Sequence, residues 1–308
     1  MKFKGKHMLS ITRKAFALAA LGALIACAST PEAPEPTREA TLFTPTRFSV
    51  EISGEGPDVI LIPGLASSRD VWDATVDQLD DRYRVHAIQV AGFAGQPAGG
   101  NAEGPVVRPL MEELARYIQH NHIERPAVIG HSLGGFTALM LARAHPESVG
   151  RVMSVDSLPF FSVLIDPNAT ADSIAPAAAG SRDQMLGMSD EQFAALQNAT
   201  MARMVRTEGE RAPVVQWSLN SDRSVVARAM YDVMTTDLRP DLASIQTPVT
   251  IVYAYDPAMM PEAAVTGLYA AQYAALPNKR LVKVDNAFHF LQLDNPAAFA
   301  AAVEEFLR

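Results

Sequence analysis

The sequence predicts an α/β fold in which a mostly parallel central sheet is flanked by helices and carries an inserted helical cap. From about residue 42, short β-type runs alternate with helical segments, which is typical of parallel sheets covered by helices. Several runs, such as Val59–Ile62, are continuously apolar, as expected of strands buried on both faces. Residues 157–240 interrupt this alternation, because they are helical in character and contain no convincing strand.

The first 27 residues have the pattern of a signal peptide. Lysines and one arginine between Lys2 and Lys14 form a basic region, and an apolar run follows over residues 15–26. The run is short for a bilayer span and lies where the apolar core of a signal peptide belongs. We therefore expect an exported protein, either in the bacterial periplasm, tethered to a membrane or secreted.

The end of this segment has two interpretations. Leu24-Ile25-Ala26-Cys27 resembles the bacterial lipobox, in which the cysteine is lipidated, and Cys27 is the only cysteine in the chain. Ala26-Cys27-Ala28 also fits the small-x-small site of ordinary signal peptidase. Residues 28–41 are polar and rich in proline, which predicts a semi-extended linker suited to a membrane tether.

The folded core is predicted to comprise residues 42–156 and 241–308, separated by the cap at 157–240. Alternation of polar and apolar residues, or continuous apolar runs, predicts strands at 47–52, 59–62, 83–90, 127–129, 151–155, 249–254 and 281–284. Helical patterns occupy 71–79, 106–122, 133–144, 261–276 and 296–307. Residues 91–105 are rich in glycine and proline and predict a loop.

Charge and composition exclude several classes of function. The net charge is −8, and residues 28–308 alone carry −13, because the first 27 residues hold five basic side chains and no acid. A chain with this net negative charge lacks the basic surface that binds the phosphates of nucleic acid. No cluster of Cys, His or carboxylates has metal-ligand spacing, so we expect no metal and no other cofactor.

The segment Gly130-His131-Ser132-Leu133-Gly134 joins a short buried strand to a helix, the context in which G-x-S-x-G marks a nucleophilic serine. A serine on such a sharp turn is strained and exposed, and side chains at Gly130 and Gly134 would clash. The backbone N–H of Leu133 at the helix start is predicted to stabilise an oxyanion. The second oxyanion donor is predicted to be the N–H of Leu65, which follows the first buried strand.

A serine nucleophile requires a base, and the base requires an acid. Among seven histidines, His289 lies in a loop just past a late strand and is the predicted base. Asp256 follows the strand at 249–254 and gives the chain order Ser, Asp, His, so it is the favoured acid. Asp156 also ends a strand and is the alternative.

These motifs resemble the capped subgroup of the α/β-hydrolase fold family over residues 42–308. The resemblance rests on Gly130–Gly135, the loop Pro63-Gly64-Leu65, Asp256 and the ending Phe288-His289-Phe290. Two details depart from the family pattern: Pro63 stands where the family often has histidine, and no glycine closely precedes Asp256.

The resemblance implies a serine hydrolase that transfers an acyl group to water, and we expect a carboxylesterase acting on small hydrophobic ester-like molecules. Cleavage of amide or carbon–carbon bonds would use the same triad and is the alternative. A non-catalytic binding protein is a further alternative, although proteins of that kind normally lose a triad member. The sequence does not indicate an oligomeric state.

Overall fold

Seven strands form one sheet in the order β1-β3-β2-β4-β5-β6-β7, in a computed structural model that describes residues 43–308. Strand β1 is antiparallel to β3, and the other neighbours are parallel. The strands are β1 (Phe48–Ser53), β2 (Asp58–Ile62), β3 (Arg84–Val90), β4 (Ala127–His131), β5 (Arg151–Val155), β6 (Val249–Tyr255) and β7 (Lys279–Asp285). The predicted signal peptide, Cys27 and the proline-rich linker lie outside the described residues.

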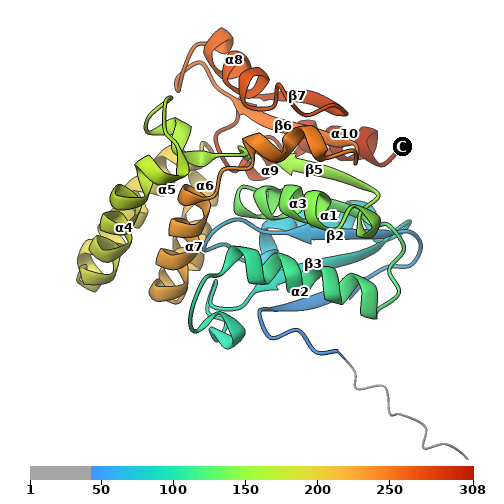
Figure 1. Cartoon of the computed structure of the whole chain (residues 1–308), viewed down its shortest axis with the longest axis horizontal. Helices are drawn as coiled ribbons and strands as arrows, with labels where there is room; N and C mark the ends of the chain where they lie inside the picture. The colour runs from blue at the N-terminus through green and yellow to red at the C-terminus, as the bar shows by residue number, and fades with distance from the viewer. Residues whose placement is uncertain (1–42) are drawn as a thin grey trace, which may run out of the picture. The chain divides into compact units, whose positions relative to one another are not determined.

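Helices cover both faces of this sheet (Figure 1). Along β2, Ile60 and Ile62 pack into a core with one set of helices, while Val59 and Leu61 pack into a second core with another set. The first set is α2 (Val107–His120), α3 (Leu133–Ala144) and α8 (Glu262–Gln272), and the second is α1 (Asp73–Leu79), α9 (Leu291–Asp294) and α10 (Pro296–Leu307). The alternation of side chains along a strand thus fills two layers, and the predicted fold class is confirmed.

Four helices lie between β5 and β6 in the chain and stand to one side of the sheet (Figure 1). They are α4 (Ala171–Gly187), α5 (Asp190–Met204), α6 (Glu208–Leu219) and α7 (Arg223–Thr235). Thr170 and Ser189 each form a capping box that begins a helix, because their hydroxyls accept backbone N–H groups that the helix leaves unpaired. We call residues 157–240 the cap.

The cap is attached to the core through α7. Asp232 accepts hydrogen bonds from the backbone N–H groups of Val106 and Val107 at the start of α2. Gly92 has φ 90°, and a Cβ at this position would lie 2.7 Å from the side chain of Val225, so only glycine lets α7 approach the loop after β3. Within residues 43–308, no helix is both long and apolar enough to cross a membrane.

Candidate active site

Ser132 stands on the sharp turn between β4 and α3, with φ 52° and ψ −117°. Few residues other than glycine adopt a positive φ, so this backbone is strained. The turn also demands its flanking glycines: a Cβ on Gly130 would lie 2.2 Å from the backbone of Gly134, and a Cβ on Gly134 would lie 2.2 Å from the carbonyl oxygen of Ile62. The backbone therefore holds Ser132 in the conformation expected of a nucleophile, at the carboxyl edge of the sheet.

His289 follows β7 and is hydrogen-bonded to Asp156. Its Nδ1–H donates to Oδ2 of Asp156 at 2.7 Å. With Nδ1 engaged in this way, the neutral ring carries its free lone pair on Nε2. Ser132, Asp156 and His289 all line one cavity, so the ring is placed as a base oriented by a carboxylate.

The prediction that Asp256 is the partner of His289 was wrong, and the alternative, Asp156, occupies that place. One carboxylate oxygen of Asp256 accepts from Nε of Arg206 at 2.8 Å and the other from the backbone N–H of Ala258 at 2.8 Å. Asp256 also lines the cavity, but its carboxylate is engaged with an arginine of the cap instead of with the base.

The register of the sheet explains why Asp156, and not Asp256, contacts His289. His131 pairs with Val155 across β4 and β5, so Ser132 and Asp156 are level with each other. Val155 in turn pairs with Val252, which puts Asp256 three residues beyond the level of Asp156. At about 3.3 Å per residue, that is about 10 Å farther along the strand direction. β6 extends farther than β5, so Asp256 lies beyond the level of Ser132.

Two groups besides His289 hold the carboxylate of Asp156. Oδ1 accepts from the backbone N–H of Ala254 at 3.0 Å and from the hydroxyl of Tyr269 at 2.9 Å. Burial, followed by the nearby charge of Asp156, raises the pKa of Tyr269 well above its ordinary value, so the tyrosine remains a donor. Tyr269 was not predicted from the sequence: Val265 and Tyr269 lie four residues apart on α8, which indicates an inward face, but this spacing does not identify the partner of the hydroxyl.

His131, beside the nucleophile, positions the loop that carries the base. Its ring is fully buried, and Nε2–H donates to the backbone carbonyl of His289 at 2.9 Å. Burial and the neighbouring His289 lower the pKa of His131 to about 3, so it is neutral at ordinary pH. Gly64 passes close to the ring, because a Cβ there would lie 2.9 Å from Nδ1. His131 thereby links the nucleophile turn, the Gly64 loop and the His289 loop.

The backbone N–H groups of Leu65 and Leu133 remain the predicted oxyanion donors. Both residues line the cavity with Ser132. Within residues 43–308, neither N–H donates a hydrogen bond to another protein group. Leu133 begins α3, where the partial positive charge of the helix terminus favours an anion. The role of these two groups stays a prediction.

A second set of contacts attaches the cap to the core, in this case to the loop that carries His289. The carboxylate of Asp294 accepts backbone N–H groups from Arg206 and Thr207, between α5 and α6, and from Phe288 in the loop, at 2.8 to 3.0 Å. The N–H of Phe290 also donates to the carbonyl of Met204. The cap is therefore fastened to the same loop that presents the base, a contact between distant segments that the sequence did not predict.

The cavity above Ser132 has a volume of about 650 Å³ and is mostly apolar. Cap and core both contribute its apolar lining, which includes Leu158, Phe161, Met185, Met201, Met204, Met230, Met234, Met259, Met260 and Phe288. Flexible methionine side chains adapt to apolar groups of varied shape. The size suits a small or medium molecule with a hydrophobic part.

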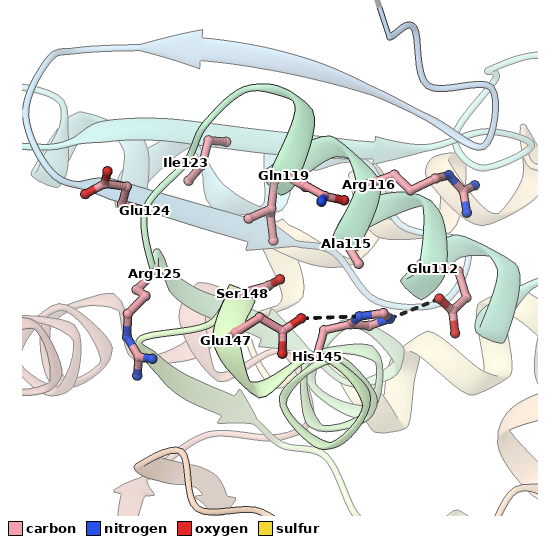
Figure 2. Close-up of a pocket in the computed structure, with 11 residues that line it drawn as sticks. Glu112, Ala115, Arg116, Gln119, Ile123, Glu124, Arg125, His145, Glu147 and Ser148 are labelled. Carbon is pink, nitrogen blue, oxygen red and sulfur yellow. Dashed lines mark hydrogen bonds and ion pairs between the residues drawn. The ribbon is translucent and has the colours of Figure 1, made fainter.

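A smaller hollow of about 450 Å³ lies at the opposite edge of the sheet, near the start of β4 (Figure 2). Its most prominent contacts are between His145 and two carboxylates, Glu112 at 3.0 Å and Glu147 at 3.7 Å. Within residues 43–308, no group of three or more His, Cys, Asp or Glu side chains, the one in this hollow included, is arranged to hold a metal ion. Ser132, Asp156 and His289 all line the larger cavity and not this hollow, so the hollow does not compete with it as a catalytic site.

The model of the α/β hydrolase fold family matches residues 57–296, well over half of the chain. This chain belongs to the α/β-hydrolase fold family. Among proteins of this family and fold, two pimeloyl-[acyl-carrier protein] methyl ester esterases are each 29% identical to the chain. The one from Aeromonas hydrophila covers 84% of this chain and 98% of its own length, and the one from Aromatoleum aromaticum covers 82% and 98%.

Solved structures share the same architecture. The enol-lactonase from Burkholderia xenovorans LB400 superposes with a TM-score of 0.68 at 22% identity and covers 84% of this chain and 96% of its own. A thermophilic esterase from Thermogutta terrifontis superposes with a TM-score of 0.70 at 20% identity and covers 85% and 93%. At these identities the likeness supports the α/β-hydrolase fold alone.

Proposed function

We propose that this α/β hydrolase is a serine esterase that cleaves carboxylic esters through an acyl-enzyme. The observation that carries the proposal is the contact between Nδ1–H of His289 and Asp156 in the cavity that contains Ser132. A serine on a strained turn, a base and an orienting carboxylate are the parts that acyl transfer requires. The relatives named methyl ester esterases support an ester as the scissile group.

In the proposed reaction, Nε2 of His289 takes the proton of Ser132 as Oγ attacks the ester carbonyl. The negative charge that develops on the carbonyl oxygen is stabilised by the N–H groups of Leu65 and Leu133. The alcohol leaves with the proton from His289, and a water molecule then releases the acid by the same steps in reverse order. Asp156 keeps Nδ1 protonated and stabilises the imidazolium. The chemistry requires no cofactor.

The test is hydrolysis of a nitrophenyl ester series, from acetate to decanoate, by residues 28–308 and by the Ser132→Ala variant. Loss of a nucleophile typically lowers kcat by about 10⁶-fold, so the activity of the variant should be lower than that of the wild type by about this factor. The dependence on chain length measures how much of the apolar cavity the acyl group fills. A folded wild-type protein inactive on every ester would contradict the proposal and would favour an amide or carbon–carbon bond, or a binding function.

We also propose that the chain is exported and tethered to a membrane through a lipid on Cys27. The basic region, the apolar run and the lipobox-like Leu24-Ile25-Ala26-Cys27 support this. Expression of the whole chain in a bacterial host fed an alkyne fatty acid should label the protein, and Cys27→Ser should remove the label. An unlabelled mature protein that begins at Ser29 would instead indicate ordinary signal peptidase, and an uncut chain would contradict export.

A further inference from the structure

A buried pair of polar side chains from the cap lies in the mostly apolar cavity. Gln197 on α5 is 8% exposed and Ser218 on α6 is 2% exposed, and both line the cavity that contains Ser132. The hydroxyl of Ser218 donates to Oε1 of Gln197 at 2.8 Å. This bond holds the side-chain amide in one orientation, in which Nε2 is directed away from Ser218.

Within residues 43–308, no protein group accepts a hydrogen bond from Nε2 of Gln197, although a glutamine amide offers two donors there. Gln292 provides a contrast, because both of its amide atoms are unpartnered and fully enclosed by protein. The Nε2 atom of Gln197 is not enclosed in this way, and the side chain of Gln197 lines the cavity.

An amide donor among apolar side chains loses its hydrogen bonds to water without replacement. Much of the lining of this cavity is apolar and includes Met185, Met201 and Met230, whose sulfur atoms are only weak acceptors. A ligand that brings an oxygen to this position would restore the missing hydrogen bond. A ligand without that oxygen would leave the donor unsatisfied, and such a difference is how a buried polar group discriminates between substrates.

We propose that Gln197 is a specificity-determining residue whose Nε2 donates a hydrogen bond to a second oxygen of the substrate, away from the scissile ester. The substrate class is an ester with an otherwise apolar chain that carries a neutral acceptor such as a ketone or a second carbonyl. Ser218 orients the amide for this contact. The inference rests on the proposed esterase function and extends it from the reacting centre to the cap.

The test compares oxo esters with an ester that lacks the second oxygen. Methyl oxo-octanoates, with the ketone moved along the acyl chain, are compared with methyl octanoate, and oxo-octyl acetates with octyl acetate. Hydrolysis is followed by pH-stat in the wild type and in Gln197→Leu. This variant has a side chain of similar size that is apolar and lacks the donor. For at least one ketone position, the wild type should prefer the oxo ester about tenfold in kcat/KM, the ratio expected of one hydrogen bond.

In Gln197→Leu the ratio should fall to about one, and in Ser218→Ala, which frees the amide to rotate, it should fall about threefold. Asn198→Leu is the matched control, because Asn198 is an exposed amide on the same helix that bonds to the carbonyl of Ala194; its ratio should equal that of the wild type. A ratio unaffected by Gln197→Leu, or no oxo preference in either series, overturns the inference. Hydrolysis of methyl octanoate reports separately on the esterase function, since failure there refutes the proposed activity itself.

Discussion

The ends of β5 and β6 each present an aspartate to the same cavity, and the two carboxylates have different partners. Asp156, after β5, binds His289, the hydroxyl of Tyr269 and a backbone N–H. Asp256, after β6, binds Arg206 of the cap and the backbone of its own loop. The carboxylate after β5 therefore contacts the base, and the carboxylate after β6 contacts the cap.

The level at which a strand ends, measured along the strand direction, decides which group the residue after it contacts. Asp156 is level with Ser132 in the register of the sheet, whereas Asp256 lies three residues farther along. Because the ring of His289 must reach both the serine and its acid, the level carboxylate is the one that can orient it. Order along the chain does not distinguish the two aspartates, since both lie between Ser132 and His289.

The substitutions Asp156→Asn and Asp256→Asn test this assignment most directly, and the first has the larger expected effect. In Asp156→Asn the amide cannot keep Nδ1 protonated and stabilise the imidazolium, so kcat should fall about 10⁴-fold. Steady-state kinetics on a nitrophenyl ester measures this, with circular dichroism as the control for folding. If Asp256→Asn alone caused the large loss, the assignment of the acid would be wrong.

His131 provides a second test, because its ring donates a hydrogen bond to the backbone carbonyl of His289 and so holds the loop that carries the base. Its pKa of about 3 in the folded protein, against about 6.5 unfolded, means that between these values the unfolded chain binds a proton that the folded chain does not. Stability from this group is therefore present above pH 6.5 and is lost as the pH falls toward 3.

His131→Gln removes this titration and retains a donor on the side chain. Between pH 6 and pH 4 the free energy of unfolding of the wild type should fall more steeply than that of the variant, by about 1.4 kcal/mol per pH unit. Urea unfolding at several pH values measures the two slopes. Equal slopes would show that His131 titrates normally in the folded protein.

Tyr269→Phe tests the environment of Asp156 with a smaller effect. The change removes the donor to Oδ1 at 2.9 Å while the carboxylate keeps Ala254 and His289. The loss of one hydrogen bond to a charged group should lower kcat about tenfold, with KM little changed. A suitable control is Tyr253→Phe, since the hydroxyl of Tyr253 contacts Thr266 and not Asp156. Equal losses in the two variants would argue against a specific role for Tyr269.

Asp256→Asn should have the smallest effect on activity, at most about threefold in kcat, because its carboxylate does not contact the base. Asparagine keeps an acceptor for the N–H of Ala258 and loses the charge pairing with Arg206, which is 46% exposed. The free energy of unfolding should fall by about 1 kcal/mol, measurable by thermal or urea unfolding. A loss of activity near that of Asp156→Asn would mean that both strand ends serve the base.

Much of the fold could be predicted from the sequence because it depends on local patterns. The apolar run at 59–62 and the helix at 133–144 reflect periodicity that neighbouring residues determine. The turn at Ser132 could be predicted for the same reason, since its glycines are required by close backbone contacts within a few residues and with the adjacent strand. The contact of Tyr269 with Asp156 and that of Asp294 with the cap could not, because each joins segments far apart in the chain. The contact of Gln197 with Ser218 could not either, because it depends on how two helices of the cap pack together.

Local patterns in the sequence were therefore enough to predict the α/β-hydrolase fold, the strained turn that carries Ser132 and the choice of His289 over the other histidines. They were not enough to predict that Asp156 is the partner of His289, because that depends on how far β6 extends past β5. The relative height of two strands is set by hydrogen-bond register between segments almost a hundred residues apart, and no local pattern in either strand records it.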